Sequence, residues 1–215
     1  MTNHGNQPIF AHSEESLELA GHSFRLCKLQ DLDAALEHYV QLSAATERIP
    51  YYVQLWDSAL ALSKYVLLNP QLFCGKHILE LGCGLGLPSL CASKIGAKVL
   101  ATDFHPDNRG FFMKNVALNK LQNIEYRELD WRQPEQLGQF DCILGSDLIY
   151  EREMIPPLLQ CVELYLAPQG CFIYADPGRA ALQDFSSRLA KLGLHEELQA
   201  IEDMFVQIWC RTHVI

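Results

Sequence analysis

The sequence predicts a doubly wound α/β fold, in which a seven-stranded, mostly parallel sheet is covered by helices on both faces. From residue 77 to residue 192, short apolar runs alternate with longer helical patterns. Such alternation is typical of parallel strands joined by crossover helices. Residues 194–201 and 205–212 are then two strand-like runs with no helical pattern between them. One of these two must run antiparallel, so an antiparallel hairpin should close the sheet.

The remaining elements follow from the same patterns. The parallel strands are expected at residues 77–81, 97–103, 124–130, 140–147 and 171–176, and their helices at 87–95, 107–120, 152–166 and 180–192. Upstream, residues 16–29 alternate around Ala20 and Gly21 like a β-hairpin, and residues 31–43 and 52–68 have helical patterns. We therefore expect a small hairpin and helix extension over residues 1–45 and one main domain over residues 46–215.

Composition limits the class of protein. The 215 residues are 49% hydrophobic and 20% charged, which is enough for a full core, and the net charge of -9 argues against a surface that follows nucleic-acid phosphates. No run approaches the roughly 20 apolar residues that a bilayer requires, and the first residues lack the basic and apolar regions of a signal peptide. We expect a cytoplasmic monomer with no nucleic-acid or membrane partner.

Cysteine and histidine spacing predicts neither a metal site nor a disulfide framework. The eight cysteines are scattered without a Cys-x-x-Cys pair, and several lie inside apolar runs. The eight histidines form no His-x-x-x-His pair. We expect the cysteines to be reduced core residues and the protein to bind no metal.

The first expected strand ends in a turn that indicates a cofactor. Glu80 is followed by Gly82, Gly84 and Gly86, at every second position, so that a ligand can lie against bare backbone. A dinucleotide turn would have its third glycine one place later, where Leu87 stands. An acid with this tighter spacing suits a ligand without phosphate and with a cationic methionine part. The turn thus favours S-adenosylmethionine, although a plain glycine-rich connection stays an alternative.

The second expected strand ends at Asp103, which lies 21 residues after Gly82. In doubly wound folds an acid roughly 20 residues after the glycine turn binds a ribose diol. We expect Asp103 and the adjacent Phe104 to contact the nucleoside. The alternative is that Asp103 caps the helical stretch that follows Pro106.

Two later strand ends carry the remaining candidates, because an open α/β sheet binds ligands at the carboxyl ends of its strands. Asp130 and Trp131 should lie beside the adenine ring, unless Trp131 is simply core packing. Asp147, next to Ser146, should face the transferred methyl group, with Tyr150 close to the acceptor. Asp147 would instead cap the next helix if its role were only structural.

Three motifs give the chain a resemblance to methyltransferase family 16, the seven-β-strand protein lysine methyltransferases of class I. They are the turn from Glu80 to Gly86, the second strand end from Ala101 to Asp103 with the run from Asn115 to Asn119 downstream, and the Asp-x-x-Tyr signature from Asp147 to Tyr150. The signature is the most specific. The resemblance covers residues 46–215 and implies a Rossmann-like class I methyltransferase sheet, S-adenosylmethionine as cofactor and a protein substrate.

Two further segments extend the resemblance. The family has an aromatic segment before its first strand, similar to residues 50–56 here, and this implies that Trp56 helps to enclose the cofactor. Tyr52 stands where Trp is more usual. Residues 176–179, Asp-Pro-Gly-Arg, are similar to the branch that methylates the electron-transfer flavoprotein β subunit, although Ile149 replaces the Phe usual in that branch.

The expected reaction is an in-line displacement at the sulfonium methyl by an amine nitrogen. Asp147 is the candidate that binds and orients the ammonium, and Tyr150 contacts the amine or the cofactor. Methylation of a nucleic-acid base is disfavoured, because Leu148 and Ile149 replace the prolines that such enzymes carry there. A small-molecule N-methyltransferase acting on a nicotinamide-like or amine substrate, and a catalytically idle binding module, stay open as alternatives.

Overall fold

The computed structural model describes residues 11–31, 33–34, 37 and 51–211. The strands of this part are β1 (His12–Leu19), β2 (His22–Leu29), β3 (His77–Leu81), β4 (Lys98–Asp103), β5 (Ile124–Glu128), β6 (Phe140–Ser146), β7 (Leu166–Asp176), β8 (His195–Ile201) and β9 (Met204–Cys210). Its helices are α2 (Asp57–Leu68), α3 (Pro70–Phe73), α4 (Leu87–Lys94), α5 (Asn108–Leu118), α6 (Ile155–Tyr165) and α7 (Leu182–Lys191), with 3-10 turns η1 (Tyr51–Val53) and η2 (Arg152–Met154).

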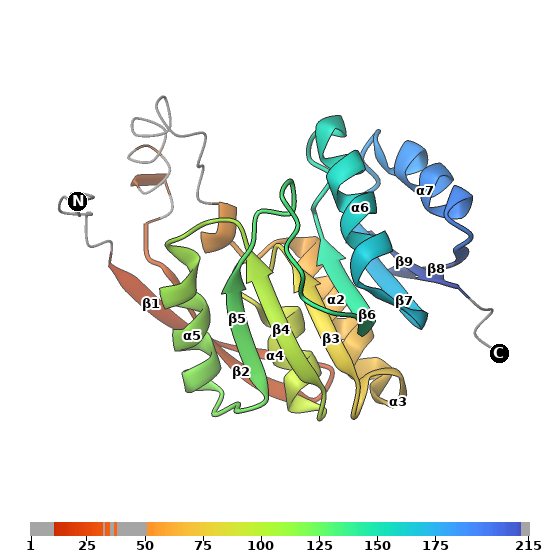
Figure 1. Ribbon diagram of the computed structural model, residues 1–215. Helices are drawn as coiled ribbons and strands as arrows, with labels where there is room; N and C mark the ends of the chain where they lie inside the picture. The colour runs from red at the N-terminus through yellow and green to blue at the C-terminus, as the bar shows by residue number, and fades with distance from the viewer. Residues whose placement is uncertain (1–10, 32, 35–36, 38–50, 212–215) are drawn as a thin grey trace.

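The main sheet has seven strands in the order β5-β4-β3-β6-β7-β9-β8 (Figure 1). Strands β5, β4, β3, β6 and β7 pair in parallel, whereas β9 is antiparallel to both β7 and β8. The predicted doubly wound sheet with an antiparallel C-terminal hairpin is therefore confirmed. The direction of winding reverses between β3 and β6, which is where open α/β sheets bind their ligands.

Alternate residues of each strand enter different cores. Ile78 belongs to a buried cluster that includes Leu62 of α2 and Phe112 of α5. Its neighbour Leu79 belongs to a second cluster that includes Phe185 of α7. Helices α2, α4 and α5 cover one face of the sheet, and α6 and α7 cover the other (Figure 1). The central strands β3 and β6 are apolar at consecutive positions because both of their faces are buried.

Two asparagines of the α5 segment hold the hairpin β1–β2. The side chain of Asn115 accepts a hydrogen bond from the backbone N–H of Cys27 at 2.6 Å. One helical turn later, Asn119 accepts from the N–H of Arg25 at 3.0 Å and donates to its carbonyl at 2.7 Å. Both amides thus satisfy the outer edge of β2, in the way a neighbouring strand would. The predicted hairpin, which turns at Ala20, is confirmed and begins earlier, at residue 12.

Some boundaries differ from those expected. The helix predicted over residues 52–68 is divided into η1 and α2, because Trp56 is extended with φ -85° and ψ 146°. Helix α3 was not foreseen, and β7 begins five residues before the expected 171. The helix predicted over residues 31–43 lies largely outside the described residues. The division between residues 45 and 46 stays a prediction.

One disulfide corrects the expectation that all the cysteines are reduced. Cys171 of β7 and Cys210 of β9 are direct partners in the antiparallel register and form a disulfide, with their Cα atoms 4.3 Å apart. Close pairs of this kind recur along an antiparallel ladder. The 39 residues that separate the two cysteines in sequence hid this pairing. The other six cysteines are free.

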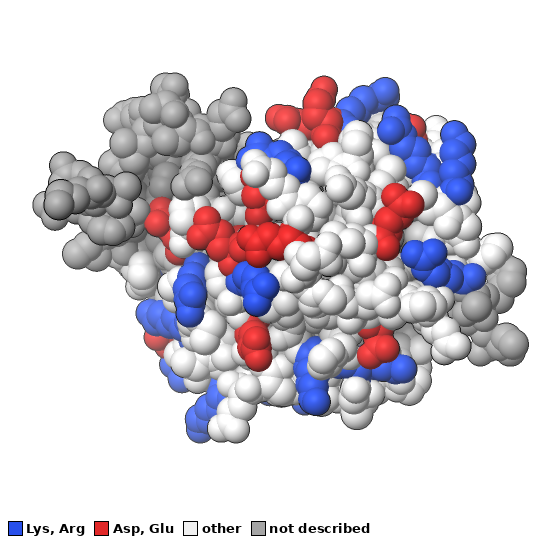
Figure 2. Space-filling model, viewed as in Figure 1, with Lys and Arg blue, Asp and Glu red and all other residues white. Residues whose placement is uncertain are grey.

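The surface reflects the acidic composition of the chain. On the face shown in Figure 2, Asp and Glu side chains gather near the carboxyl ends of β4 and β5, while Lys and Arg are scattered around them. Among the helices of the described ranges, none combines the length and the apolar character of a membrane span.

Candidate functional site

A cavity of about 640 Å³ opens at the carboxyl ends of β3, β4 and β6, where the winding of the sheet reverses. Its walls come from the segment around η1, the glycine turn after β3 and the loops after β4, β5, β6 and β7. Of the predicted site residues, the structure brings together in its lining Trp56, Gly82, Gly84, Gly86, Asp103, Phe104, Trp131, Ser146, Asp147 and Tyr150.

The glycine turn needs its glycines for two reasons, a left-handed backbone and close neighbouring side chains. Gly82, Gly84 and Gly86 all have positive φ, at +63°, +52° and +83°. A side chain on Gly82 would lie 2.7 Å from Leu148, and one on Gly86 would lie 2.3 Å from the Phe112 ring. At Gly84 the nearest atoms are 3.6 Å away, so there the left-handed backbone is the main constraint. The result is a backbone turn that faces the cavity with almost no side chains.

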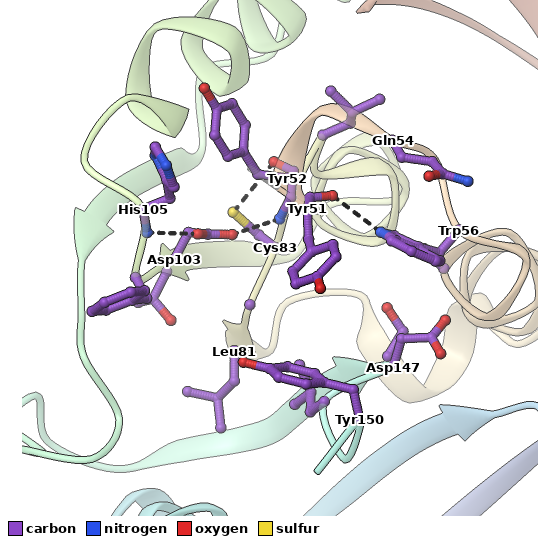
Figure 3. Close-up of a pocket in the computed structure, with 18 of the residues that line it drawn as sticks. Tyr51, Tyr52, Gln54, Trp56, Leu81, Cys83, Asp103, His105, Asp147 and Tyr150 are labelled. Atoms are coloured by element: carbon purple, nitrogen blue, oxygen red, sulfur yellow. Dashed lines mark hydrogen bonds between the residues drawn. The ribbon is translucent and has the colours of Figure 1, made fainter. Parts of the chain in front are cut away.

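Asp103 is fixed by backbone groups on both of its oxygens. Oδ2 accepts from the N–H of Gly84 at 2.9 Å, and Oδ1 accepts from the N–H of His105 at 2.9 Å (Figure 3). Burial raises the pKa of Asp103 above its ordinary value, although the hydrogen bonds from His105 and Gly84 oppose this shift. Asp103 therefore joins the ends of β3 and β4 at the cavity wall.

Two predicted cofactor residues are not part of the cavity wall. Glu80 points to the other face of the sheet, where its carboxylate accepts hydrogen bonds from the backbone and hydroxyl of Ser89 in α4. Burial raises the pKa of Glu80 to about 8. The carboxylate of Asp130 pairs with Arg132, with Nε to Oδ1 at 2.9 Å and Nη2 to Oδ2 at 3.0 Å. Glu80 thus connects β3 to α4, and Asp130 holds Arg132, which lines the cavity.

Aromatic rings line the side of the cavity beyond Asp103. Phe104 lies under the guanidinium of Arg132, with 4.7 Å between the guanidinium carbon and the ring centroid. Tyr52 and His105 pack with ring centroids 4.5 Å apart, at an interplanar angle of 44°. Flat π-surfaces beside a carboxylate suit a nucleoside, because they can pack on a base while the acid binds the ribose.

Asp147 lies one residue after the end of β6 in an unusual backbone conformation. Its φ is +56°, and its N–H donates to the carbonyl of Ala175 at 3.1 Å. Asp tolerates the left-handed region better than most residues, and such positions often occur at functional sites. The Asp147 carboxylate forms an ion pair with Arg179, and both residues line the cavity.

The mouth of the cavity beside Asp147 is aromatic. Tyr51 and Tyr150 have ring centroids 5.9 Å apart and are 47% and 50% exposed. Trp56 packs edge-on against Tyr51 and donates from Nε1 to its carbonyl at 3.1 Å. In Figure 3 the two tyrosine rings lie next to each other, with Asp147 beyond them below Trp56. An elongated side chain that entered here would reach Asp147 between apolar surfaces.

Several lining residues were not selected from the sequence. They include Tyr51, Gln54, His105, Leu148, Arg132 and Glu151. Each lies within a few residues of a predicted one. His105, Leu148, Arg132 and Glu151 are in loops that follow strands of the main sheet, where open α/β sheets bind their ligands. Tyr51 and Gln54 belong to the segment around η1, which that rule does not cover. In the described part of the chain, no group of three or more His, Cys, Asp or Glu side chains is arranged to hold a metal ion.

A family model and two related proteins that match this chain are all described as lysine methyltransferases. A family model described as lysine methyltransferase matches residues 40–190. Protein N-lysine methyltransferase METTL21A of Danio rerio is 34% identical over 133 residues, which are 59% of this chain and 61% of that protein. The electron transfer flavoprotein beta subunit lysine methyltransferase of Mus musculus is 31% identical over 155 residues, or 71% and 58%. The chain thus spans about three fifths of the length of these two relatives.

A third relative and two solved structures extend this comparison. EEF1A lysine methyltransferase 3 of Mus musculus is 31% identical over 173 residues, which are 77% of this chain and 74% of that protein. The ribosomal protein L11 methylase of Lactobacillus delbrueckii subsp. bulgaricus has a TM-score of 0.62 at 21% identity, covering 72% of this chain and 80% of that one.

The T. Thermophilus 16S rRNA N2 G1207 methyltransferase, solved with AdoMet and guanosine, has a TM-score of 0.66 at 16% identity over 95% of this chain and 52% of that one. At such low identities the two structures speak for the fold alone. The family model, by contrast, matches 151 consecutive positions from residue 40 to residue 190, well over half of the chain. The chain belongs to the lysine methyltransferase family.

Proposed function

We propose that this protein is an S-adenosylmethionine-dependent N-methyltransferase that modifies a lysine side chain of another protein. The observation that carries the proposal is the single cavity that joins the glycine turn and Asp103 to Asp147 and Tyr150. Membership of the lysine methyltransferase family supports the same reaction.

The residues of the inner half fit the proposed cofactor. The cavity volume of about 640 Å³ lies within the roughly 300–1,000 Å³ of small-molecule sites. Gly82 and Gly84 would lie against the methionine part, and Asp103 would accept hydrogen bonds from the ribose hydroxyls. Phe104 and Trp131 would pack on the adenine. The turn from residue 82 to residue 86 contains no Lys or Arg, as suits a ligand without phosphate.

The outer half would hold the acceptor. When bound, S-adenosylmethionine would supply an electrophilic methyl group, which the acceptor nitrogen takes while the sulfur keeps the electron pair. Asp147 would bind and orient the lysine ammonium, and Tyr51 and Tyr150 would enclose its carbon chain. Having a lysine of pKa about 10.4 neutral at pH 7 costs roughly 5 kcal/mol. The site must therefore favour loss of the ammonium proton, which passes to water.

A protein acceptor fits the entrance better than a free metabolite. Tyr51 and Tyr150 are half exposed at the mouth, so they can contact a partner surface as well as the inserted side chain. The net charge of -9 and the acidic area of Figure 2 favour a basic partner over nucleic acid. We further propose that the protein acts as a cytoplasmic monomer on a protein substrate.

The test is transfer of labelled methyl from S-adenosylmethionine into a dialysed lysate of the organism that makes this protein, followed by mass spectrometry of the labelled band. Wild type should label a discrete protein on lysine. Asp147→Asn should lose at least 100-fold in rate, since Asn keeps the left-handed backbone at residue 147 but lacks the carboxylate that would bind and orient the ammonium.

A parallel reaction uses the undialysed small-molecule fraction of the same lysate. Label that appears only in this fraction would overturn the protein-lysine proposal and favour a small-molecule N-methyltransferase. Absence of both labelling and cofactor binding would instead identify a binding module without catalysis.

A further inference from the structure

Arg179 reaches into the acceptor half of the cavity from the loop after β7. Its Nη1 forms an ion pair with Oδ1 of Asp147 and lies 3.4 Å from Oδ2 of Asp176. The Arg179 side chain is 31% exposed, and those of Asp147 and Asp176 are 12% and 1% exposed. The guanidinium is thus placed between a buried acid and the acid that is proposed to meet the substrate.

The buried side of this arrangement is held firmly. Oδ1 of Asp176 accepts from the backbone N–H groups of Gly178 and Arg179, both at 2.7 Å. Oδ2 of Asp176 accepts from the hydroxyl of Tyr174 at 3.0 Å, and that hydroxyl accepts from the N–H of Ile149 at 3.2 Å. These bonds connect the loop after β7 to the Asp147–Tyr150 segment. The backbone of Arg179 is therefore held in place by Asp176, and its side chain extends to Asp147.

The groups around Arg179 determine the charge state of its guanidinium. Besides the two carboxylates, Tyr174 on β7 interacts with the charge of Arg179. The other titratable or charged residues that line the cavity are Tyr51, Tyr52, Cys83, Asp103, His105, Arg132, Tyr150 and Glu151. Burial alone would lower the pKa of Arg179, but the hydrogen bond to Asp147 and the charges of Asp147 and Asp176 raise it above its ordinary value. The guanidinium is therefore charged whenever the carboxylates are.

We propose that Arg179 is a positioning residue that controls the charge of the acceptor amine, by neutralising Asp147 and fixing the direction of its carboxylate. An unpaired carboxylate stabilises an ammonium and raises its pKa, which opposes methylation. A carboxylate paired with arginine still accepts a hydrogen bond, yet it holds the amine's proton less strongly. Arg179 thus resolves the conflict between binding the lysine and deprotonating it. The inference rests on the proposed lysine methyltransferase activity.

The test is the pH dependence of turnover in Arg179→Gln. The acceptor is the lysate protein that wild type labels. It is identified by mass spectrometry, purified, and used at saturating concentration with labelled S-adenosylmethionine. In the variant, the acid limb of the kcat profile should move to higher pH by about one unit. Turnover at pH 7 should then fall about tenfold and recover at alkaline pH. Affinity for the cofactor, measured by calorimetry, should be unchanged.

Two further variants separate this role from a structural one. Arg179→Lys keeps a positive charge beside Asp147, so its acid limb should return toward that of wild type. Arg188→Gln removes an exposed arginine that pairs with Asp184 far from the cavity lining, and its profile should equal that of wild type. Thermal unfolding of all three variants checks that each is folded.

An Arg179→Gln enzyme that is slower at every pH with an unmoved acid limb would overturn the inference, as would a higher KM for the protein alone. Either result would leave the proposed function intact, because wild type would still methylate lysine. If wild type labels no protein, the proposed function fails first and this inference fails with it.

Discussion

Asp103 and Asp147 are both at or next to the carboxyl end of a strand, yet they are held in opposite ways. Asp103 ends β4 in regular geometry and receives backbone N–H groups on both oxygens. Asp147 follows β6 with φ +56° and is paired with the guanidinium of Arg179. One acid is fixed by the backbone, and the other is paired with the side chain of another residue.

The difference supports the proposal that the two halves of the cavity bind different ligands, the cofactor beside Asp103 and the acceptor beside Asp147. Backbone hydrogen bonds do not change when a ligand enters, so the Asp103 half is suited to a constant ligand such as a cofactor. A charge pair can rearrange when an ammonium approaches, so the Asp147 half is suited to a step in which charge changes. The exposed tyrosines are also confined to this outer half.

The most damaging change to the cofactor half should be Gly86→Ala. The added methyl would meet the Phe112 ring at 2.3 Å, on a backbone with φ +83°. We expect a loss of roughly 3 kcal/mol in the free energy of unfolding, measured with urea. The control is Gly110→Ala in α5, where nothing lies within 4 Å and stability should rise slightly. Equal effects at both positions would show that the turn is not closely packed.

Asp103→Asn tests whether the Asp103 carboxylate binds the cofactor. Asn keeps one acceptor oxygen but replaces the other with a donor that faces the N–H of Gly84 or His105. Cofactor affinity, measured by calorimetry, should fall roughly 10–100-fold, the range for a lost charged hydrogen bond. Asp184→Asn, on the surface of α7, is the matched control. Unchanged affinity in Asp103→Asn would remove Asp103 from the cofactor half.

A smaller effect on stability is expected from Glu80, which lies in β3 and accepts hydrogen bonds from Ser89 of α4. Its pKa is raised from 4.5 to about 8, so between these values the folded protein holds a proton that the unfolded chain has lost. The free energy of unfolding should therefore fall as pH rises through this window, by at most about 1.4 kcal/mol per pH unit.

Glu80→Gln should flatten that slope while matching wild type near pH 5, since Gln can still accept from Ser89. Chemical denaturation at pH 5, 6, 7 and 8 measures both slopes. Glu125→Gln, at an exposed position of β5, should keep the slope of wild type. Parallel slopes for wild type and Glu80→Gln would mean that the Glu80 carboxyl is ionised in the folded protein.

Much of the fold could be predicted because its signals are local. Apolar runs with helical patterns between them specify parallel strands, and the glycine turn and Asp103 lie within 25 residues of one another. The direction of Glu80 was also available from strand alternation. Leu79 and Leu81 enter the core beneath α6 and α7, so Glu80 must point to the other face, toward α4.

The acceptor half was harder to predict because its contacts are long-range. Arg179 meets Asp147 across 32 residues, and Tyr51 meets Tyr150 across the cavity mouth. No periodicity in the sequence encodes such pairs, which depend on how segments far apart in the chain come together around the cavity. The Cys171–Cys210 disulfide was missed for the same reason.

The most direct test that the two halves have separate roles measures cofactor affinity and methyl-transfer rate on the same Asp147→Asn variant. Calorimetric titration with S-adenosylmethionine should give a Kd within about twofold of wild type, because Asp147 lies in the acceptor half. Methyl transfer by the same preparation should fall at least 100-fold. A variant that binds the cofactor tenfold more weakly, or that keeps wild-type turnover, would contradict the assignment of Asp147 to the acceptor.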